Sequence, residues 1–545
     1  MKKLISVLLC AVMLFAFCAP AFATEIQEIY PVVYIEGQGI YLVRDERTAE
    51  QKHIYSLQKD VASEVLGNIK PLLLEIAKGF VMGGDYSAYT KTLVDIMNPI
   101  YEDVVLGADG MPKDNSAVYI SNQWRGSGRL SNIQRTIPVT NGEYPVYRWL
   151  YDWRLSPIVL AEELNDLVDA VLAETGAKKV NLVSRCLGTN IAYAYLCNEE
   201  YGAKEKINSC VFYAAALEGL GILDALFSGE AVIDAGALDR FLIYYREGNN
   251  LVINDEVTTD VIFALVELLE EVQVLGFTTE QLSVVINQVL AQAGPEVLRG
   301  CYGSFPSYWS MVSADAYEKA RDFVFPTDED KAEWAGLIAQ TDAYYEIEKN
   351  LEENLKELSN YINFSVVAKY GLPDFPLSED GGVDSDAFVS AARASLGAKV
   401  TDLDKKLSDS YVKKAKENGT DKYISADRKI DASTCLFPET TWFVKGVEHK
   451  NFPDCVNDII IDFINSDGEM TVFSNPEFTQ FMQFTDLNGQ SSDSGRGLLT
   501  PINTIDDTED LTNKYTKSKL EALFAFLLKF FKMIFNLFKG GEVTV

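Results

Sequence analysis

The chain has very little histidine and few cysteines. Only two histidines, His53 and His449, occur in its 545 residues. The eight cysteines include no C-x-x-C pair, so a zinc site built from cysteine and histidine ligands is not expected. Cysteine is also too sparse for a disulfide-based scaffold. We therefore expect no metal, and no motif in the chain indicates a cofactor.

Basic residues are scarce relative to acidic ones. The chain has 48 Lys and Arg against 80 Asp and Glu, and its formal net charge is −32. Such an excess of negative charge repels phosphate backbones. The composition therefore excludes nucleic acid as an expected partner, while leaving the class of substrate and the oligomeric state open.

The N-terminal apolar run is short. Lys2 and Lys3 precede the apolar residues Leu4–Cys18, and Ala21–Ala23 form an A-x-A cleavage site. This pattern is typical of a secretory signal, here residues 1–23, and the run is too short for a comfortable membrane span. We expect a secreted or extracellular protein. The cysteines that remain are Cys186, Cys197, Cys210, Cys301, Cys435 and Cys455, and their pairing stays open.

Apolar runs and helical periodicity alternate along the first half of the chain. Residues 30–35, 145–150, 179–183 and 211–215 have the character of strands. Between the second and third runs, Ser156 and Pro157 are typical of the start of a helix and Gly176 of its end. Strands and helices joined by short links predict an α/β fold with a mostly parallel sheet covered on both faces.

The rest of the chain divides by composition. A helical region is expected up to about residue 96, the last strand at 442–444, and a helix at 456–464. The expected organisation is a signal peptide (1–23), the first part of the core (24–216), a helical cap (217–345), the second part of the core (346–484), a polar linker (485–518) and an amphipathic basic helix (519–541).

Residues 184–188, Ser-Arg-Cys-Leu-Gly, follow an apolar strand and precede a helix of small residues. This is the context of the strained G-x-S-x-G turn that presents a nucleophile. Cys186 occupies the nucleophile position, and the N-terminus of the following helix favours a thiolate. Ser184 is the weaker alternative, because its side chain is expected to point into the packing beneath the strand.

His449 is the expected general base. It follows the last candidate strand, whereas His53 comes before most of the sheet. Asp427 is the expected acid, with Asp431 as the alternative, because both lie on a loop upstream of His449. The acid would hold the imidazole in one tautomer and stabilise the imidazolium. The alternatives are a surface histidine and aspartates that only solvate a turn.

Two backbone amides are expected to form the oxyanion hole. The Leu187 amide directly follows the nucleophile. The Gln38 amide lies on the loop after the first strand, where Gly37 and Gly39 allow close approach to a substrate. Glu36, in the same loop, would place a carboxylate near the developing negative charge.

Several segments resemble one known family. Residues 152–154 (Asp-Trp-Arg), 305–309 (Phe-Pro-Ser-Tyr-Trp) and 427–430 (Asp-Arg-Lys-Ile), with Ser433 and His449, are similar to the lecithin:cholesterol acyltransferase-like branch of the α/β-hydrolases. The resemblance extends from about residue 30 to 464. It implies an α/β-hydrolase fold and esterase, lipase or acyltransferase chemistry on an acyl ester or lipid substrate.

The last helix, 519–541, has a wide apolar and aromatic face and a narrow stripe of lysines. Its apolar positions include Leu520, Leu523, Phe524, Leu527, Phe531, Ile534, Phe535 and Phe538. Such a helix is typical of proteins that bind to a membrane, such as the cell surface, or to a partner protein. Packing on the protein's own core is the alternative. A span is less expected because lysines interrupt the apolar stretch.

Two hypotheses follow. The first is a secreted acyl-ester hydrolase or acyltransferase that uses a Cys186–His449–Asp427 triad and a thioester intermediate. The second is a catalytically inactive protein of the same fold that acts as a surface-binding or membrane-associated module. Glu36 and Ser184 motivate the second hypothesis, because neither belongs in a typical hydrolase site.

Overall fold

The computed structural model leaves some segments undescribed. The described residues are 30–38, 41–44, 50–53, 75, 85–102, 104–113, 124–125, 146–149, 151–231, 279–374, 383–403, 405–449, 451–486 and 497–503. The expected signal peptide (1–23) and amphipathic helix (519–541) both lie outside these residues.

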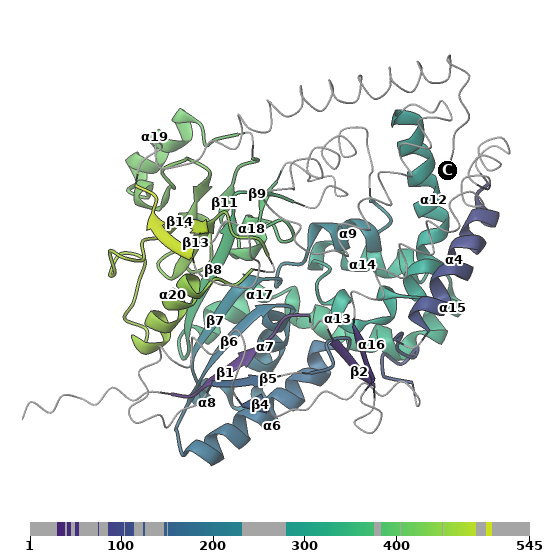
Figure 1. Cartoon of the computed structure of the whole chain (residues 1–545), viewed down its shortest axis with the longest axis horizontal. Coiled ribbons are helices and arrows are strands. Elements are labelled where there is room, and N and C mark those ends of the chain that lie inside the picture. The colour runs from purple at the N-terminus through teal and green to yellow at the C-terminus, as the bar shows by residue number, and fades with distance from the viewer. Residues whose placement is uncertain are drawn as a thin grey trace, which may run out of the picture.

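A single large sheet forms the centre of the described structure (Figure 1). Its strands, in spatial order, are β15 (Gly497–Pro501), β14 (Phe481–Asp486), β13 (Thr441–Lys445), β8 (Asn363–Tyr370), β7 (Ile207–Ala215), β6 (Val180–Cys186), β1 (Val32–Ile35), β5 (Val146–Trp149) and β4 (Trp124–Arg125). The strands from β5 to β14 pair in parallel, and only the two edge strands run antiparallel. The prediction of an α/β fold with a mostly parallel sheet is confirmed.

The chain changes direction across this sheet between β1 and β6. From β1 it moves to β5 on one side, and it then returns to β6 on the other side of β1. In open α/β sheets, ligands bind at the carboxyl ends of the strands where the strand order reverses in this way. Residues 36–38 follow β1 and Cys186 ends β6, so both lie at this point.

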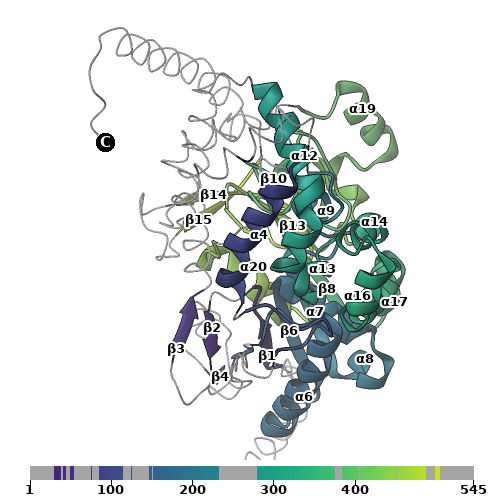
Figure 2. The same cartoon turned by 90° about the vertical axis from the view of Figure 1, so that its right-hand side faces the viewer.

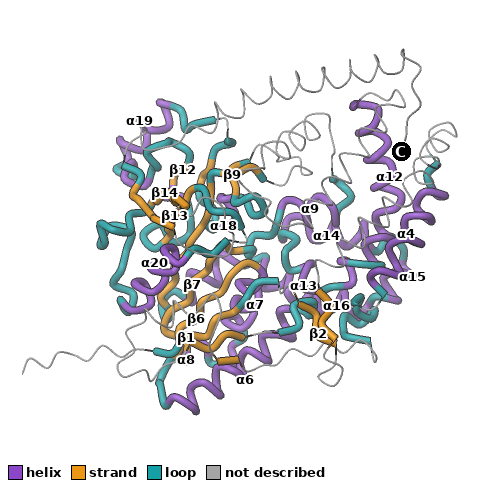
Figure 3. The backbone as a smooth tube through the Cα atoms, in the orientation of Figure 1, coloured by secondary structure: helices purple, strands orange, loops and turns teal. Residues whose placement is uncertain are grey.

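Helices cover both faces of the sheet, as Figure 3 shows for the helices around the strands. Helices α6 (Pro157–Thr175) and α7 (Leu187–Cys197) pack on one face, while α20 (Asp454–Asn465) packs on the other. The limits of α6 agree with the sequence: the Ser156 hydroxyl accepts a hydrogen bond from the Ile158 amide (3.2 Å), and Gly176 ends the helix with a φ of 69°.

The described elements between β7 and β8 are all helical. They are α9 (Gly221–Phe227), α12 (Thr279–Arg299), η3 (Tyr302–Ser304), α13 (Pro306–Trp309), α14 (Ala314–Val324), α15 (Asp328–Glu333), α16 (Ala335–Glu348) and α17 (Leu351–Leu358). Helix α4 (Ser87–Tyr101) packs alongside α12 (Figure 2), while α16 contacts α6 and α7. The role of residues 217–345 as a cap stays a prediction. No helix in the described ranges is long and apolar enough to cross a membrane.

Two expectations were wrong. The predicted helical region after β1 contains a hairpin of β2 (Tyr41–Arg44) and β3 (Glu50–His53), which places His53 on a strand. The strand at 441–445 is not the last one, because β14 and β15 extend the sheet beyond it. At the edge of the sheet, these strands keep polar residues among the apolar ones, which obscured them in the sequence.

The chain between β8 and β13 forms short helices and strands. In chain order they include β9 (Leu372–Pro373), β10 (Asp384–Ser385), α18 (Ala391–Ala394), β11 (Lys399–Val400), α19 (Asp409–Asn418) and β12 (Ile430–Asp431). The pair β9 and β10 forms an antiparallel arm that leaves the carboxyl end of β8. This arm carries the chain back towards the centre of the sheet.

Gly188 sets the distance between α7 and β1, and we expect Gly188→Ala to destabilise the protein. A Cβ at this position would lie 2.6 Å from the Ile35 carbonyl oxygen and 2.4 Å from that of Glu36. Backbone atoms cannot rotate away, so overpacking should lower the free energy of unfolding by about 1–3 kcal/mol. Denaturant unfolding measures this. The control is Gly294→Ala in α12, whose Cβ would meet only the movable Phe323 ring; equal losses would contradict the prediction.

Candidate active site

Cys186 stands in a strained turn between β6 and α7. Its backbone has φ 48° and ψ −130°, a conformation that residues other than glycine rarely adopt. The Thr189 hydroxyl donates to the Cys186 carbonyl oxygen (2.6 Å) and accepts from the Ala216 amide (3.1 Å). These bonds tie the turn to the end of β7. The structure thus bears out the strand-to-helix turn predicted around Cys186.

The loop after β1 passes directly beside Cys186. A Cβ built on Gly37 would lie 2.9 Å from the Cys186 Cβ and 3.7 Å from Sγ, so glycine is needed for this approach. The Tyr151 hydroxyl donates to the carbonyl oxygens of Glu36 and Gly37 and thereby holds the loop in place. The two expected oxyanion residues therefore come from segments that meet at the thiol.

The two oxyanion assignments have different support. The Leu187 amide is close enough to the Cys186 sulfur for hydrogen bonding to lower the pKa of the thiol, which supports this assignment. Gln38 is half-buried, and its side-chain oxygen accepts a hydrogen bond from the Tyr308 hydroxyl (3.2 Å). Its backbone amide as the second donor stays a prediction.

Glu36 is neutralised by two arginines. Its carboxylate lies 2.7 Å from Nε of Arg148 and 3.1 Å from Nε of Arg185. The Arg185 guanidinium also lies over the Phe452 ring, 3.8 Å from its centroid. The carboxylate that the sequence places near the oxyanion loop therefore brings no uncompensated negative charge to it.

His449 joins Cys186 to a buried carboxylate. Its Nδ1 lies 2.7 Å from Oδ2 of Asp386, whose side chain is fully buried. The imidazole also lies beside the Cys186 thiol, close enough for charge and hydrogen bonding between the two to lower the pKa of the thiol and raise that of His449. The backbones of the same two residues, His449 and Asp386, are also hydrogen-bonded: the His449 amide donates to the Asp386 carbonyl oxygen (2.8 Å). This geometry agrees with the prediction that His449 is the general base for Cys186.

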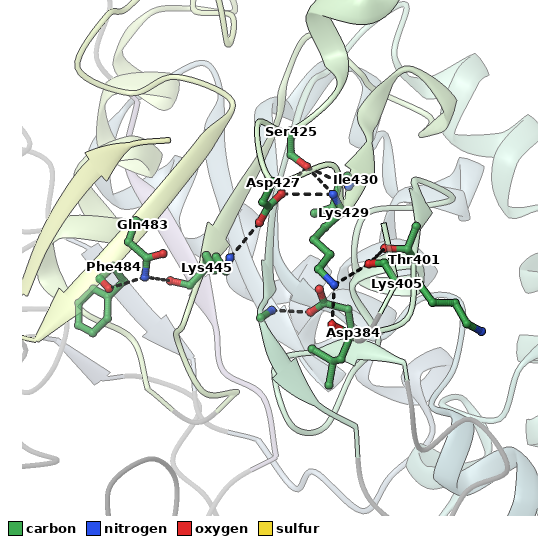
Figure 4. Close-up of polar contacts among 12 residues, drawn as sticks. Asp384, Thr401, Lys405, Ser425, Asp427, Lys429, Ile430, Lys445, Gln483 and Phe484 are labelled. Atoms are coloured by element: carbon green, nitrogen blue, oxygen red, sulfur yellow. Dashed lines mark hydrogen bonds and ion pairs between the residues drawn. The ribbon is translucent and has the colours of Figure 1, made fainter. Parts of the chain in front are cut away.

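Asp427 was the wrong choice of acid. Its carboxylate is paired with Nζ of Lys445 (2.9 Å) and accepts from the Ser425 hydroxyl (2.7 Å), as Figure 4 shows. The alternative, Asp431, accepts from the Tyr411 hydroxyl (2.8 Å). Neither hydrogen-bonds to His449, and both are buried rather than on a solvated turn.

The position of Asp386 follows from the order of the strands. His449 follows β13, and β13 lies beside β8, so the loop that leaves β8 is the one that reaches the imidazole. That loop includes the arm of β9 and β10, and Asp386 directly follows β10. The sequence did contain a signal for this carboxylate, which is the group of aspartates that follows the strand-like residues 364–370. The aspartates nearest to His449 along the chain were the wrong place to look.

Asp384 attaches this arm to the end of β8, and other buried charged groups lie beside it. Asp384, on β10, accepts a hydrogen bond from the Gly371 amide at the end of β8. Burial raises the pKa of Asp384 to about 7, in spite of the nearby Lys429 and Lys445 ammonium groups. Figure 4 shows Asp384 and Asp427 beside these two lysines. Asp427 therefore has a structural role close to the site.

The charges of the site favour a thiolate. Burial by itself would raise the pKa of the Cys186 thiol, but the charge and hydrogen bond of His449, with the Leu187 amide and Arg185, lower it overall. Burial would likewise lower the pKa of His449, but Asp386 and Cys186 raise it to about 9. Both shifts stabilise the same state, a thiolate beside an imidazolium.

The other candidate nucleophiles lack these features. The Ser184 hydroxyl is fully buried and donates to the Val211 carbonyl oxygen (3.1 Å), as the direction of its side chain predicted. All six described cysteines are free. Burial raises the pKa of Cys197 and of Cys455 to about 12, so these thiols stay protonated.

Within the described ranges, no three His, Cys, Asp or Glu side chains lie close enough to hold a metal ion. Comparison with models of known protein families and with curated proteins finds no match for this chain. What the site can do therefore follows from its geometry and its charges.

Replacing the two aspartates separates their roles. We expect Asp386→Asn to lower any turnover by the site by roughly 10⁴-fold, because the imidazole loses its orienting acceptor. Asp427→Asn should retain turnover and lower the free energy of unfolding by about 3 kcal/mol, because it removes the carboxylate that pairs with the buried Lys445 ammonium. Ester turnover and denaturant unfolding measure the two effects; the reverse pattern would restore Asp427 as the acid.

Proposed function

We propose that this protein is a secreted α/β-hydrolase that transfers acyl groups through Cys186, acting as an ester hydrolase or an acyltransferase. One observation carries the proposal: the Cys186 thiol, the His449 imidazole and the Asp386 carboxylate form a hydrogen-bonded series at the switch point of a parallel sheet. Nucleophile, base and orienting acid in this arrangement are the requirements for covalent acyl transfer.

In the first half of the reaction, the Cys186 thiolate attacks the carbonyl carbon of the ester. The tetrahedral oxyanion is stabilised by the amide of Leu187 and, as proposed, by that of Gln38. When the C–O bond breaks, the imidazolium of His449 gives its proton to the departing alkoxide through Nε2. The products are a free alcohol and an acyl thioester on Cys186.

In the second half, the neutral His449 takes a proton from water or from an acceptor alcohol. The resulting oxygen nucleophile attacks the thioester carbonyl, and the C–S bond breaks to release the thiolate of Cys186. The acid or the new ester leaves, and the thiolate–imidazolium pair is restored. Asp386 stays ionised throughout and stabilises the imidazolium.

The surroundings of the thiol support an acyl substrate. Tyr151 and Tyr308 are close enough to Cys186 for its charge to raise their pKa values further, although burial is the main cause of those shifts. The Tyr308 ring stacks on Tyr302 (4.9 Å between centroids), and Phe388 lies 5.1 Å from His449. An aromatic environment of this kind accommodates apolar acyl chains, lipids included.

The two features that suggested an inactive protein have structural explanations. Glu36 pairs with Arg148 and Arg185, and Ser184 is hydrogen-bonded inside the sheet. Neither obstructs Cys186. These contacts favour the catalytic hypothesis over the binding-module hypothesis.

Acyl transfer should leave a thioester on one cysteine. With p-nitrophenyl butyrate in excess, we expect a burst of about one p-nitrophenol per protein and one butyryl group on Cys186 by intact-mass and peptide analysis. Cys186→Ala should abolish the burst and the adduct. Hydroxylamine at neutral pH should remove the adduct, because thioesters react with it readily.

Cys455→Ala is the matched control for the labelling. Cys455 is also a free cysteine, but its raised pKa keeps the thiol protonated. Its removal should leave both the burst and the adduct unchanged. An adduct that persists in Cys186→Ala, or a wild-type protein that never forms one, would refute acyl transfer and leave the binding-module hypothesis.

The thiolate–imidazolium pair predicts the pH dependence of alkylation. Since the pKa of Cys186 is lowered and that of His449 is raised to about 9, iodoacetamide should alkylate Cys186 readily at about pH 6, well below the usual thiol pKa of about 8.5. Turnover should be lost as the pH rises past the His449 pKa, because the leaving group then lacks its proton donor. Rates from peptide mass spectrometry measure the first effect.

His449→Gln tests the cause of this reactivity. Without the imidazolium, burial should raise the pKa of Cys186, and alkylation should become slow at about pH 6. Equal rates in the variant and the wild type would show that the thiol is not activated by His449.

A further inference from the structure

Lys369 is a fully buried lysine in a central strand. It lies in β8 between β7 and β13, and none of its surface is exposed. Lysine is almost never buried completely unless its charge is compensated. The acyl-transfer reaction described above makes no use of this residue, although it stands near the carboxyl end of a strand beside the site.

The ammonium of Lys369 binds the loop that carries His449. Its Nζ donates to three carbonyl oxygens of that loop: those of Glu448 (3.1 Å), His449 (2.9 Å) and Asn451 (2.7 Å). It also lies over the Phe452 ring, 4.0 Å from the centroid. A protonated lysine has three N–H donors, so every donor is used on one short segment.

We propose that Lys369 is a positioning residue for catalysis, whose ammonium fastens the His449 loop to the end of β8 so that the imidazole meets both the thiol and Asp386. This inference rests on the proposed acyl-transfer function, because it assigns a role within the same site. Asp386 fixes one nitrogen of the ring, while Lys369 fixes the backbone from which the ring projects.

The charge of Lys369 is part of this role. Burial lowers its pKa to about 7, and the main opposing influence is the nearby carboxylate of Asp386. The other charged or titratable groups near it are Arg185, which lowers the pKa further, Glu448 and Cys186, which raise it, and Tyr213 of β7, whose ring centroid lies 4.9 Å from Nζ. The uncharged amine has only two N–H donors, so loss of the proton releases one carbonyl oxygen of the loop.

Lys369→Met tests the role without requiring turnover. The methionine keeps most of the length of the side chain and removes all three donors. We expect alkylation of Cys186 at about pH 6 to slow by about tenfold, because the loosened imidazolium no longer stabilises the thiolate. For ester turnover we expect roughly a 10²-fold loss in kcat with little change in KM, as for a misplaced catalytic group.

Lys429→Met is the matched control. Lys429 is a second buried lysine whose Nζ donates to three carbonyl oxygens of one loop, those of Asp402 (3.2 Å), Leu403 (2.5 Å) and Lys405 (2.6 Å). Figure 4 shows its side chain reaching this segment. The control should lower thermal stability and leave the alkylation rate of Cys186 unchanged. If both variants slow alkylation equally, or if Lys369→Met does not slow it, the proposal is wrong.

Lys369→Arg supplies the second readout, because arginine stays charged at every accessible pH. In the wild type, kcat should show a first, partial decline near the pKa of Lys369, about 7, before the complete loss past the His449 pKa. In the variant this decline should move towards the His449 pKa of about 9, and a decline that does not move would overturn the charged role. A wild type that forms no acyl adduct would refute the proposed function. The alkylation comparison would still decide the role of Lys369, because alkylation depends on the state of the thiol and not on turnover.

Discussion

The bond between His449 and Asp386 connects two loops that leave neighbouring strands, and the arrangement of the site depends on it. Its length of 2.7 Å, in a region where Asp386 is fully buried, makes it a charge-assisted hydrogen bond shielded from water. Asp386 keeps the imidazolium charged, and the imidazolium in turn stabilises the thiolate of Cys186. Around this series, the strained turn at Cys186, the close approach of Gly37 and the pairing of Glu36 with two arginines all serve to bring one sulfur to one imidazole.

Local sequence patterns predicted the parts of the structure that depend on local physics. The turn at Cys186, the limits of α6 from Ser156 to Gly176 and the parallel character of the sheet all follow from short-range signals. Asp386, the carboxylate that contacts His449, could not be found in this way, because proximity along the chain limited the candidates to Asp427 and Asp431. Which loop reaches His449 is decided by the order of the strands, and that order is a property of the whole sheet. The last two strands, β14 and β15, were missed because strands at or next to an edge of a sheet need not be uniformly apolar.

Buried charge is concentrated near the carboxyl ends of β8 and β13. Lys369 and Lys429 each donate to three carbonyl oxygens of a loop, and Lys445 pairs with the Asp427 carboxylate. Hydrophobic packing alone does not determine where a loop lies to within a fraction of an ångström, whereas ammonium groups with three directed bonds do so more closely. The loop that carries His449 therefore has a defined position although it lies outside the strands. This use of charge also explains why Asp427, although it does not contact His449, is so deeply buried.

The wide separation of the site residues along the chain has a consequence for biosynthesis. Cys186 and its strand belong to the first half of the polypeptide, whereas Asp386 is added 200 residues later and His449 263 residues later. Contacts between such distant segments form late, since closing a long loop is slow. Until they form, the sulfur has no imidazolium beside it and has the ordinary thiol pKa of about 8.5, so that only a few per cent is thiolate at neutral pH. The activated form of Cys186 is therefore a property of the completed sheet and not of the strand that carries the cysteine.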